Sequence, residues 1–307
     1  MSIEGRCRSA VCLAGYFKDV AALHYSAKRR LGKDGIIWYP VSSFLLPFFN
    51  QVAGKNIPEN TYPLISYLWE YARQTDDLFD RSTKFPSSDE TDTATASARG
   101  KLITAIQKAE ITDLQKNELT DEIRELRERV YQAFEDQNNW IKQPSFEKAF
   151  NYRKNSSLLL MRKIAVMGNI LALTSDERKK RVEDCLEDIG VIMQFIDDLM
   201  DVEEDSLLDG NLIHAVLHDE DEQELFTRAL SLAPDQTGLF KLLEDSAPKT
   251  KLFISRIIAQ SLANLESNSF SVGISVKFFT GLLLKNVKIS RQKRDFLSKF
   301  ANEMHRL

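Results

Sequence analysis

Two groups of aspartates in this chain have the same spacing, with two adjacent residues and a third three positions later. They are Asp76, Asp77 and Asp80 (the first acidic cluster) and Asp197, Asp198 and Asp201 (the second acidic cluster). Residues three and four positions apart lie on one face of a helix, so each cluster would gather its carboxylates there. Carboxylates at that spacing repel one another unless a cation lies between them. Hard oxygen ligands with room for water indicate Mg²⁺ that is bound together with a polyphosphate group.

The chemistry that such a site supports is the release of diphosphate from an organic group. Mg²⁺ ions, about two or three of them, would neutralise the leaving diphosphate and allow an allylic C–O bond to ionise. We expect all six aspartates to take part in catalysis and five of them to be metal ligands. These five are Asp76, Asp77, Asp80, Asp197 and Asp201.

A basic segment between the two clusters could hold the diphosphate from the side opposite the metal ions. Arg153 and Lys154 lie in the segment Tyr152–Ser157, on the helix that precedes the second cluster. Alone, such residues would be surface charges, but a desolvated phosphate needs charged donors of this kind. We therefore predict that Arg153 and Lys154 bind the substrate.

Apolar helices must position both clusters. The first cluster ends an apolar helical stretch that runs from Tyr62 to Phe79, and the second lies in the stretch 190–205, which is apolar over most of its circumference. A helix of that kind is buried. We expect this second helix to start at Ser175 and to end at Asp209-Gly210, with Asp205 extending its acidic stripe.

The rest of the chain divides into helices at prolines, glycines and capping residues, and no alternating strand pattern persists. The predicted class is therefore all-α, an irregular bundle of about ten to twelve helices. We expect a helix over 8–31, short helices over 36–53, two helices over 100–141, a helix over 146–172 capped by Ser145, and later breaks near Pro234, Pro248 and 267–273. The Ser-, Thr- and Asp-rich segment 81–100 predicts a loop, which is either a lid beside the first cluster or a plain surface loop.

The composition indicates one domain and excludes some classes of function. With 307 residues, 43% of them hydrophobic, and no long Gly/Pro-rich linker, we expect a single domain over 1–307. The net charge of −4 gives no basis for nucleic-acid binding. No run reaches the ~18 apolar residues of a membrane span. The three cysteines lack metal-ligand spacing, so we expect a reducing, cytoplasmic location without a transmembrane segment.

At these residues the sequence resembles the class I isoprenoid synthases, which include trans-prenyl diphosphate synthases, squalene and phytoene synthases, and terpene cyclases. The first acidic cluster, Lys154 and the stretch Gln194–Asp201 follow the order of the motifs in trans-prenyl diphosphate synthases. The resemblance implies a helical bundle around a deep apolar cavity. It also implies a prenyl diphosphate substrate, Mg²⁺ as the cofactor and a homodimer as one possible assembly.

The resemblance also assigns substrate-binding roles around the clusters. Gln194 matches the glutamine of the second motif, and Arg73 matches the diphosphate-facing arginine of squalene and phytoene synthases. Arg81 lies where head-to-tail synthases carry arginines after the first motif. Tyr71 lies five positions before the first cluster, where the prenyl synthases place the floor of the cavity. It would limit the product to a short chain, or it is merely a core aromatic.

The sequence leaves several functions open. The leading interpretation is a Mg²⁺-dependent prenyltransferase that acts on allylic prenyl diphosphates. The family's basic site for isopentenyl diphosphate has only a loose counterpart in Lys28-Arg29-Arg30, and its Gly-Lys after the second motif is Gly210-Asn211 here. The missing isopentenyl-site arginines favour a terpene cyclase that releases diphosphate from a C15–C20 prenyl diphosphate, whereas the second acidic cluster favours the prenyltransferase. The sequence is also compatible with a non-catalytic regulatory subunit of a synthase, or with a helical protein that has two solvated acidic turns.

Overall fold

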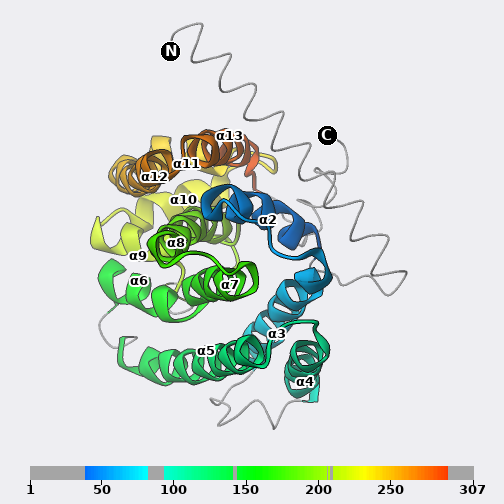
Figure 1. Ribbon diagram of the computed structural model, residues 1–307. Helices are drawn as coiled ribbons and strands as arrows, with labels where there is room; N and C mark the ends of the chain where they lie inside the picture. Colours follow the sequence, from blue (N-terminus) through cyan, green and yellow to red (C-terminus); the bar gives the residue numbers. More distant parts are fainter. Residues whose placement is uncertain (1–38, 82–92, 141–143, 206, 208–209, 290–307) are drawn as a thin grey trace, which may run out of the picture. The chain divides into compact units, whose positions relative to one another are not determined.

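The computed structural model describes residues 39–81, 93–140, 144–205, 207 and 210–289. Within these ranges the chain is helical, apart from connecting turns and an isolated antiparallel bridge between Gly238 and Lys288. The run of helices from α2 to α13 confirms the predicted all-α class (Figure 1). The helix predicted over 8–31 and the Lys28-Arg29-Arg30 cluster lie outside the described residues.

The helices follow one another with mostly short connections. Their bounds are α2 Tyr39–Ala53, the 3-10 helix η2 Glu59–Thr61, α3 Tyr62–Arg81, α4 Thr93–Lys108, α5 Asp113–Trp140, α6 Phe146–Asn155, α7 Ser157–Ala172, α8 Asp176–Met200, α9 Leu212–Asp219, α10 Gln223–Leu232, α11 Leu239–Ser246, α12 Pro248–Asn268 and α13 Phe270–Asn286. Among the described residues, no helix combines the length and the apolar composition that crossing a membrane requires.

The chain forms two compact units. One comprises Met1–Glu135, Leu159–Glu187 and Leu265–Ser275, and the other comprises Asp136–Leu158, Asp188–Asn264 and Val276–Leu307. The first acidic cluster belongs to the first unit and the second acidic cluster to the second. The single domain over 1–307 stays a prediction.

Helix α2 runs through Pro47 without a break, so the prediction of separate short helices is wrong for residues 39–53. Pro40 lies in the first turn, where a missing N–H is tolerated. Pro47 lies inside the helix, but its neighbours Leu46 and Phe48 are only 3% and 0% exposed. Burial of this apolar surface outweighs the ~3 kcal/mol that an internal proline costs a helix.

Helix α3 carries the first acidic cluster at its end, as the sequence predicts. It begins with Pro63 in its first turn and ends at Arg81. Helix α4 packs against α3. The Thr95 hydroxyl on α4 donates a hydrogen bond of 2.9 Å to the Gln74 carbonyl on α3. Helix α4 therefore supports the segment of α3 that leads into the cluster.

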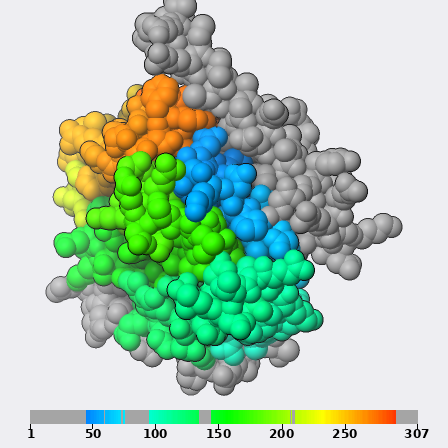
Figure 2. All heavy atoms as spheres, viewed as in Figure 1, coloured from blue at the N-terminus to red at the C-terminus, as the bar shows by residue number. Residues whose placement is uncertain are grey.

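The loop predicted over 81–100 is wrong for residues 93–100, which are the beginning of α4. Residues 82–92 lie outside the described part of the chain, and a lid there stays a prediction. Despite the Ser- and Thr-rich composition, the segment contributes to a buried helix face formed by Thr95, Ala98, Leu102 and Ile106. Both helices expected over 100–141 are confirmed, and in Figure 2 the side chains of α4 and of the first part of α5 form one continuous surface.

The single helix predicted over 146–172 is interrupted once. Ser145 caps α6 as predicted, because its hydroxyl accepts a hydrogen bond of 3.3 Å from the Lys148 N–H. The helix then breaks at Ser156, whose φ of −117° and ψ of −99° are not helical. The Ser156 hydroxyl donates to the Tyr152 carbonyl at 3.0 Å, so a side chain replaces part of the lost backbone bonding. The break places the basic segment at the end of α6.

Helix α8 carries the second acidic cluster and ends earlier than predicted. It starts after Ser175, as expected, but it ends at Met200 instead of Asp209-Gly210. The stretch from Asp201 to Asp205 is mostly acidic, and negative charges at the carbonyl end of a helix oppose its dipole. The acidic stripe predicted on one helix therefore continues into a turn.

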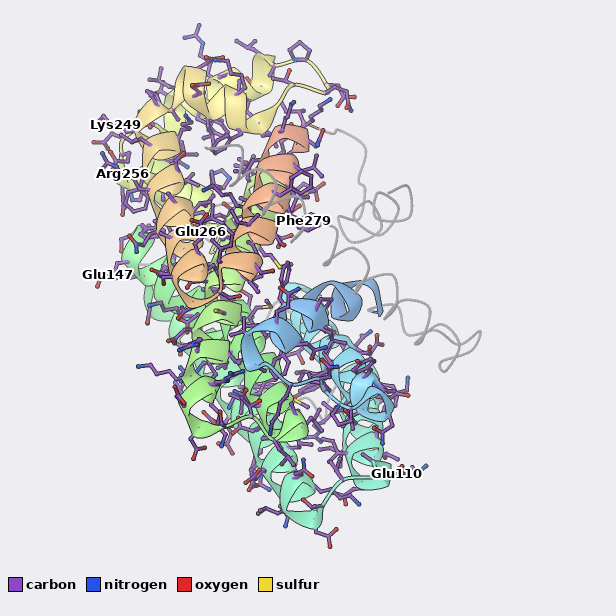
Figure 3. The ribbon with its side chains drawn as sticks, turned by 45° about the horizontal axis from the view of Figure 1, so that its top comes forward. Glu110, Glu147, Lys249, Arg256, Glu266 and Phe279 are labelled. Atoms are coloured by element: carbon purple, nitrogen blue, oxygen red, sulfur yellow. The ribbon has the colours of Figure 1, made fainter. Side chains whose placement is uncertain are left out.

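The helices after the second acidic cluster confirm the predicted breaks. Helix α10 packs against α9 and α11, and α9 also packs against α6 (Figure 1). Pro248 is the first residue of α12. The buried Glu222 carboxylate accepts hydrogen bonds from the N–H groups of Lys249 at 3.2 Å and Thr250 at 2.9 Å, which caps this helix. Figure 3 shows Lys249 and Arg256 along α12.

Two glycines of α13 allow a matched test of close packing. A Cβ atom at Gly273 would lie 2.6 Å from backbone atoms of Glu266, whereas one at Gly281 would meet nothing within 4 Å. Gly273→Ala should lower the free energy of unfolding by about 1–3 kcal/mol, because backbone must move. Gly281→Ala should raise it by about 0.5–1 kcal/mol through better helix propensity. Urea denaturation measures both, and effects of the same sign would contradict this packing.

Candidate active site

The first acidic cluster occupies the last turns of α3. The helical backbone carries Asp76, Asp77 and Asp80, with Arg73 one turn before them and Arg81 at the helix end. The side chains of these five residues lie outside the described ones. Their roles as metal ligands and substrate-binding residues therefore stay predictions.

The three aspartates of the second acidic cluster differ in their exposure. Asp198 is only 2% exposed, Asp197 is half-buried, and Asp201, the residue after α8, is exposed. Adjacent helical positions point about 100° apart, so Asp198 can face the interior while Asp197 does not. The cluster therefore contains one inward carboxylate and two that solvent reaches.

Asp198 is held by three hydrogen-bond donors. Its Oδ1 accepts from Gln194 Nε2 at 2.7 Å and from Arg153 Nη2 at 3.3 Å, and its Oδ2 accepts from the Leu212 N–H at 2.7 Å. Burial raises the pKa of the Asp198 carboxyl, and Arg153, the Leu212 amide and Gln194 act against that rise. This donor set suits an ionised carboxylate that has a structural role.

Gln194 links Asp198 to the start of α7. Its side chain is 7% exposed, and its Oε1 accepts a hydrogen bond of 2.5 Å from the Ser157 hydroxyl. The sequence predicts Gln194 as a substrate-binding residue, and this stays a prediction. Sequence reasoning gave Ser157 no role, and only its position beside the basic segment could have suggested one.

A turn at Gly210 and Asn211 packs against Asp198. Gly210 has a φ of 77°, which favours glycine, and its carbonyl accepts a hydrogen bond of 3.0 Å from Arg153 Nε. Asn211 Nδ2 donates to the Asp198 carbonyl at 2.7 Å and to Asp205 Oδ2 at 3.1 Å. The turn is therefore tied to the second acidic cluster at several points.

Asn211 is a site residue whose role the sequence reasoning missed. It is completely buried, and its Oδ1 accepts from the N–H groups of Ile213 and His214, which caps α9. An asparagine directly before an apolar helix is a frequent cap, so the signal was present in the sequence.

Negative charge is crowded around Asp201. Although the Asp201 residue is exposed as a whole, its carboxyl group is partly shielded from water, and this desolvation together with the carboxylates of Asp205, Glu204 and Asp198 raises the pKa of Asp201 to about 6. A divalent cation at this position would relieve the repulsion.

Replacing Asp201 by Asn should stabilise the metal-free protein at neutral pH. The pKa of about 6 lies above the ordinary value of 3.8. Stability is therefore lost as the pH rises from about 4 to about 6, where Asp201 ionises in the folded state. Because solvent screens this exposed group, we expect a gain of only about 1 kcal/mol for the variant at neutral pH. Thermal unfolding in EDTA measures it. A difference between the variant and the wild type that does not shrink towards pH 4 would contradict this cause.

The two basic residues of α6 have different surroundings. The Arg153 side chain is 15% exposed and pairs with Asp198, whereas Lys154 is exposed, with Nζ 5.0 Å from the centre of the Phe150 ring. The sequence predicts the same role for both. The structure gives them separate environments on one turn of helix.

Mg²⁺ fits the oxygen donors of the second acidic cluster. Within the described ranges no three His, Cys, Asp or Glu side chains converge closely enough to enclose a metal ion. Mg²⁺ is commonly bound through only one or two carboxylates together with water and substrate phosphates. Asp197 and Asp201 supply carboxylates of that kind, and a cation there would offset the negative charge that Asp205 and Glu204 add beside Asp201.

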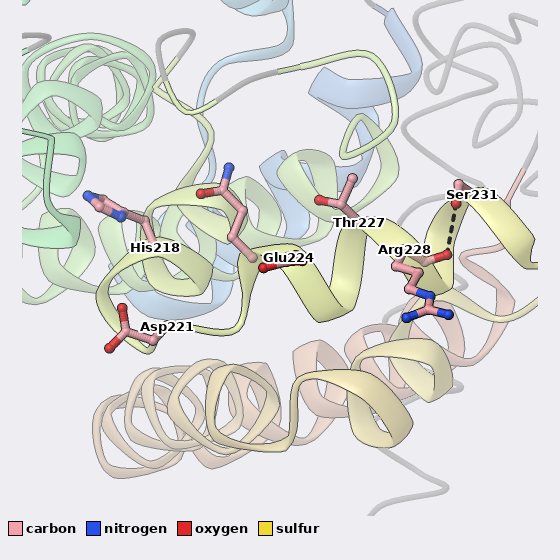
Figure 4. A pocket seen from close by; sticks show the side chains of 7 residues that line it. His218, Asp221, Glu224, Thr227, Arg228 and Ser231 are labelled. Atoms are coloured by element: carbon pink, nitrogen blue, oxygen red, sulfur yellow. Dashed lines mark hydrogen bonds between the residues drawn. The ribbon is translucent and has the colours of Figure 1, made fainter.

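A separate hollow lies along α10. It has a volume of about 730 Å³ and is lined by His218, Asp221, Gln223, Glu224, Thr227, Arg228 and Ser231 (Figure 4). Its charged side chains are exposed and of mixed sign. None of the residues that the sequence predicts for the site lines it, so we assign it no role in the chemistry.

Comparison with known proteins gives a likeness of fold. No protein-family description matches this sequence, and no curated protein matches it either. The structure is similar to that of the geranylgeranyl pyrophosphate synthetase from Pyrococcus horikoshii Ot3, with 13% sequence identity and a TM-score of 0.57 over 91% of this chain and 99% of that chain. The geranylgeranyl pyrophosphate synthetase from the archaeon Geoglobus acetivorans is similar at 12% identity and a TM-score of 0.55, over 89% and 98%. This chain therefore has the helical isoprenoid synthase fold, as predicted.

Proposed function

We propose that this chain is a Mg²⁺-dependent prenyltransferase that ionises an allylic prenyl diphosphate and transfers the prenyl group. The observation that supports the proposal is the repeated acidic pattern in a chain whose fold resembles two geranylgeranyl pyrophosphate synthetases. Prenyl transfer requires that a diphosphate leaves from carbon, and charge neutralisation of that group is the largest need of the reaction.

The chain's own residues would have the following roles in this reaction. The metal ligands would be the first acidic cluster together with Asp197 and Asp201, and the bound Mg²⁺ ions would neutralise the leaving diphosphate. The exposed ammonium group of Lys154 would pair with the same diphosphate, with Arg73 and Arg81 as further donors. Phe195, next to Gln194, stacks with Phe146 at 6.3 Å, and aromatic faces of this kind stabilise a carbocation. The deep apolar cavity expected of the fold stays a prediction.

A terpene cyclase is the second candidate, and one observation favours it. The buried amide of Asn211 caps α9 and bonds to Asp198 and Asp205, at a position where the related synthases carry a lysine. A chain without that lysine has fewer charged donors for a second diphosphate, and a cyclase needs none.

Incubation with allylic diphosphates distinguishes these functions. The full chain is supplied with Mg²⁺ and with C10, C15 or C20 prenyl diphosphate, each with and without isopentenyl diphosphate. The prenyltransferase proposal expects diphosphate release together with uptake of a second prenyl unit. Formation of a hydrocarbon or an alcohol from the allylic substrate alone would contradict the prenyltransferase proposal and support the cyclase. Inactivity under all conditions would favour the regulatory subunit.

Tyr71→Ala should lengthen the product if Tyr71 forms the floor of the substrate cavity. Tyr71 is 2% exposed on α3, before the first acidic cluster. Loss of the ring would open room for about one further isoprene unit, at a stability cost of about 3–5 kcal/mol, since a large buried side chain is removed. Product chain length by chromatography measures the effect, and Tyr71→Phe is the size-matched control. An unchanged product from a folded variant would leave Tyr71 as a core residue.

A further inference from the structure

A largely buried ion pair joins Arg153 to Asp198 of the second acidic cluster. Arg153 Nη2 lies 3.3 Å from Asp198 Oδ1, and the two side chains are 15% and 2% exposed. Nε of the same guanidinium donates to the Gly210 carbonyl at 3.0 Å. A buried ion pair contributes little net stability, because desolvation offsets the attraction. Its main effect is to fix the orientation of the groups that it joins.

This ion pair joins the segments that carry the proposed chemistry. Arg153 belongs to α6, Asp198 to α8 and Gly210 to the turn before α9. Because Asp197 and Asp201 lie on the same backbone as Asp198, the inward anchoring of Asp198 sets the directions in which those two carboxylates point.

We propose that Arg153 is a positioning residue for the second acidic cluster, in contrast to its neighbour Lys154, to which the proposed function already assigns the diphosphate. Arg153 acts through Asp198 and keeps Asp197 and Asp201 oriented for Mg²⁺. The inference rests on the proposed function, since it assigns a role toward the metal and the diphosphate of that reaction. The sequence predicts substrate binding for both residues, whereas this inference gives the two adjacent residues different roles.

The test compares two variants that each remove one cation with a double variant that removes both charges of the ion pair. Arg153→Gln and Lys154→Gln both lose a cation from the end of α6, and Arg153→Gln combined with Asp198→Asn replaces the ion pair by two neutral groups that can bond to each other. Arg124→Gln also removes one cation, from an exposed ion pair with Asp121, and is the control that should leave activity unchanged. Circular dichroism establishes that each variant is folded.

The first readout is the steady-state release of diphosphate from a C15 allylic diphosphate. Arg153→Gln should lower kcat by about 10- to 100-fold and raise the Mg²⁺ concentration for half-maximal rate by about tenfold, with little change in KM, as for residues that orient metal ligands. Lys154→Gln should raise KM instead. The double variant should regain most of the kcat that Arg153→Gln loses, because it no longer contains an uncompensated buried carboxylate.

Two results would overturn the proposal. One is a KM that rises at least tenfold in Arg153→Gln with an unchanged Mg²⁺ requirement. The other is a double variant as poor as the single variant. Either result would show that Arg153 does not act by orienting the second acidic cluster through Asp198.

A second readout separates this inference from the proposed function. Mn²⁺ binding to the same proteins is titrated by electron paramagnetic resonance in the presence of inorganic pyrophosphate. A wild type that releases no diphosphate from any prenyl substrate would remove the proposed function alone. Weaker Mn²⁺ binding in Arg153→Gln, restored in the double variant, would still support positioning. Equal Mn²⁺ affinity in all variants, or no Mn²⁺ binding by the wild type, would overturn it.

Discussion

Alanine at Asp76 or at Asp197 should lower the rate of diphosphate release by about 100- to 1000-fold, because each change removes a ligand of the ions that stabilise the leaving group. The fold should survive, since loss of one of several like charges relieves repulsion. Release of inorganic diphosphate under saturating substrate and Mg²⁺ measures the effect. Asp121→Ala, which removes a 66% exposed carboxylate on α5, is the control and should leave the rate unchanged. Full activity in both Asp variants would contradict a catalytic role for the clusters.

The double variant of Asp76 and Asp197 tests whether the two clusters serve one reaction step. Residues that act as a unit show strongly non-additive effects. The double variant should therefore lose little more than the worse single variant. If the fold-loss of activity in the double variant equals the product of the two single losses, the two clusters have separate roles.

Asp198→Ala should lower the free energy of unfolding by about 3–5 kcal/mol, because it leaves the largely buried Arg153 guanidinium without its carboxylate. The hydrogen bonds from Gln194 and from the Leu212 N–H would also lose their acceptor. Urea denaturation measures the loss. The adjacent Asp197→Ala is the matched control, and it should change stability by less than about 1 kcal/mol because its carboxylate is only half-buried. Equal effects at the two positions would contradict the inward orientation of Asp198.

The sequence predicted the elements that carry the site because these have strong local signals. The apolar stretch that ends in the first acidic cluster is α3, and Ser175 does precede α8. Ser145 also caps α6 as predicted. Long apolar stretches with capping residues at their ends are strong local signals for where a helix begins and runs.

Other features depend on contacts that no local pattern shows. The helix α2 continues through Pro47 because its neighbours are buried, and α4 begins at Thr93 because one of its faces packs against α3. Composition alone predicts a break and a loop at these places. Tertiary burial outweighs local propensity in both cases.

The different environments of Arg153 and Lys154 also could not be predicted from the sequence. The partner of Arg153 is Asp198, 45 positions away, so the pair is defined only by the packing of α6 near the end of α8. Adjacent residues of like charge have the same sequence signal but point in different directions around a helix. Asn211 is similar, since its cap was visible in the sequence but its bonds to Asp198 and Asp205 were not.

The proposed function requires that this chain ionises an allylic prenyl diphosphate with the help of Mg²⁺. The most direct measurement is the release of inorganic diphosphate from C10, C15 and C20 prenyl diphosphates by the purified full chain, with Mg²⁺, with excess EDTA, and after Mg²⁺ is restored. The proposed function predicts release with Mg²⁺, none above the uncatalysed rate with EDTA, and full recovery when the metal is returned. Release that continues in EDTA, or no release of diphosphate from any of the three substrates with Mg²⁺ present, would contradict it.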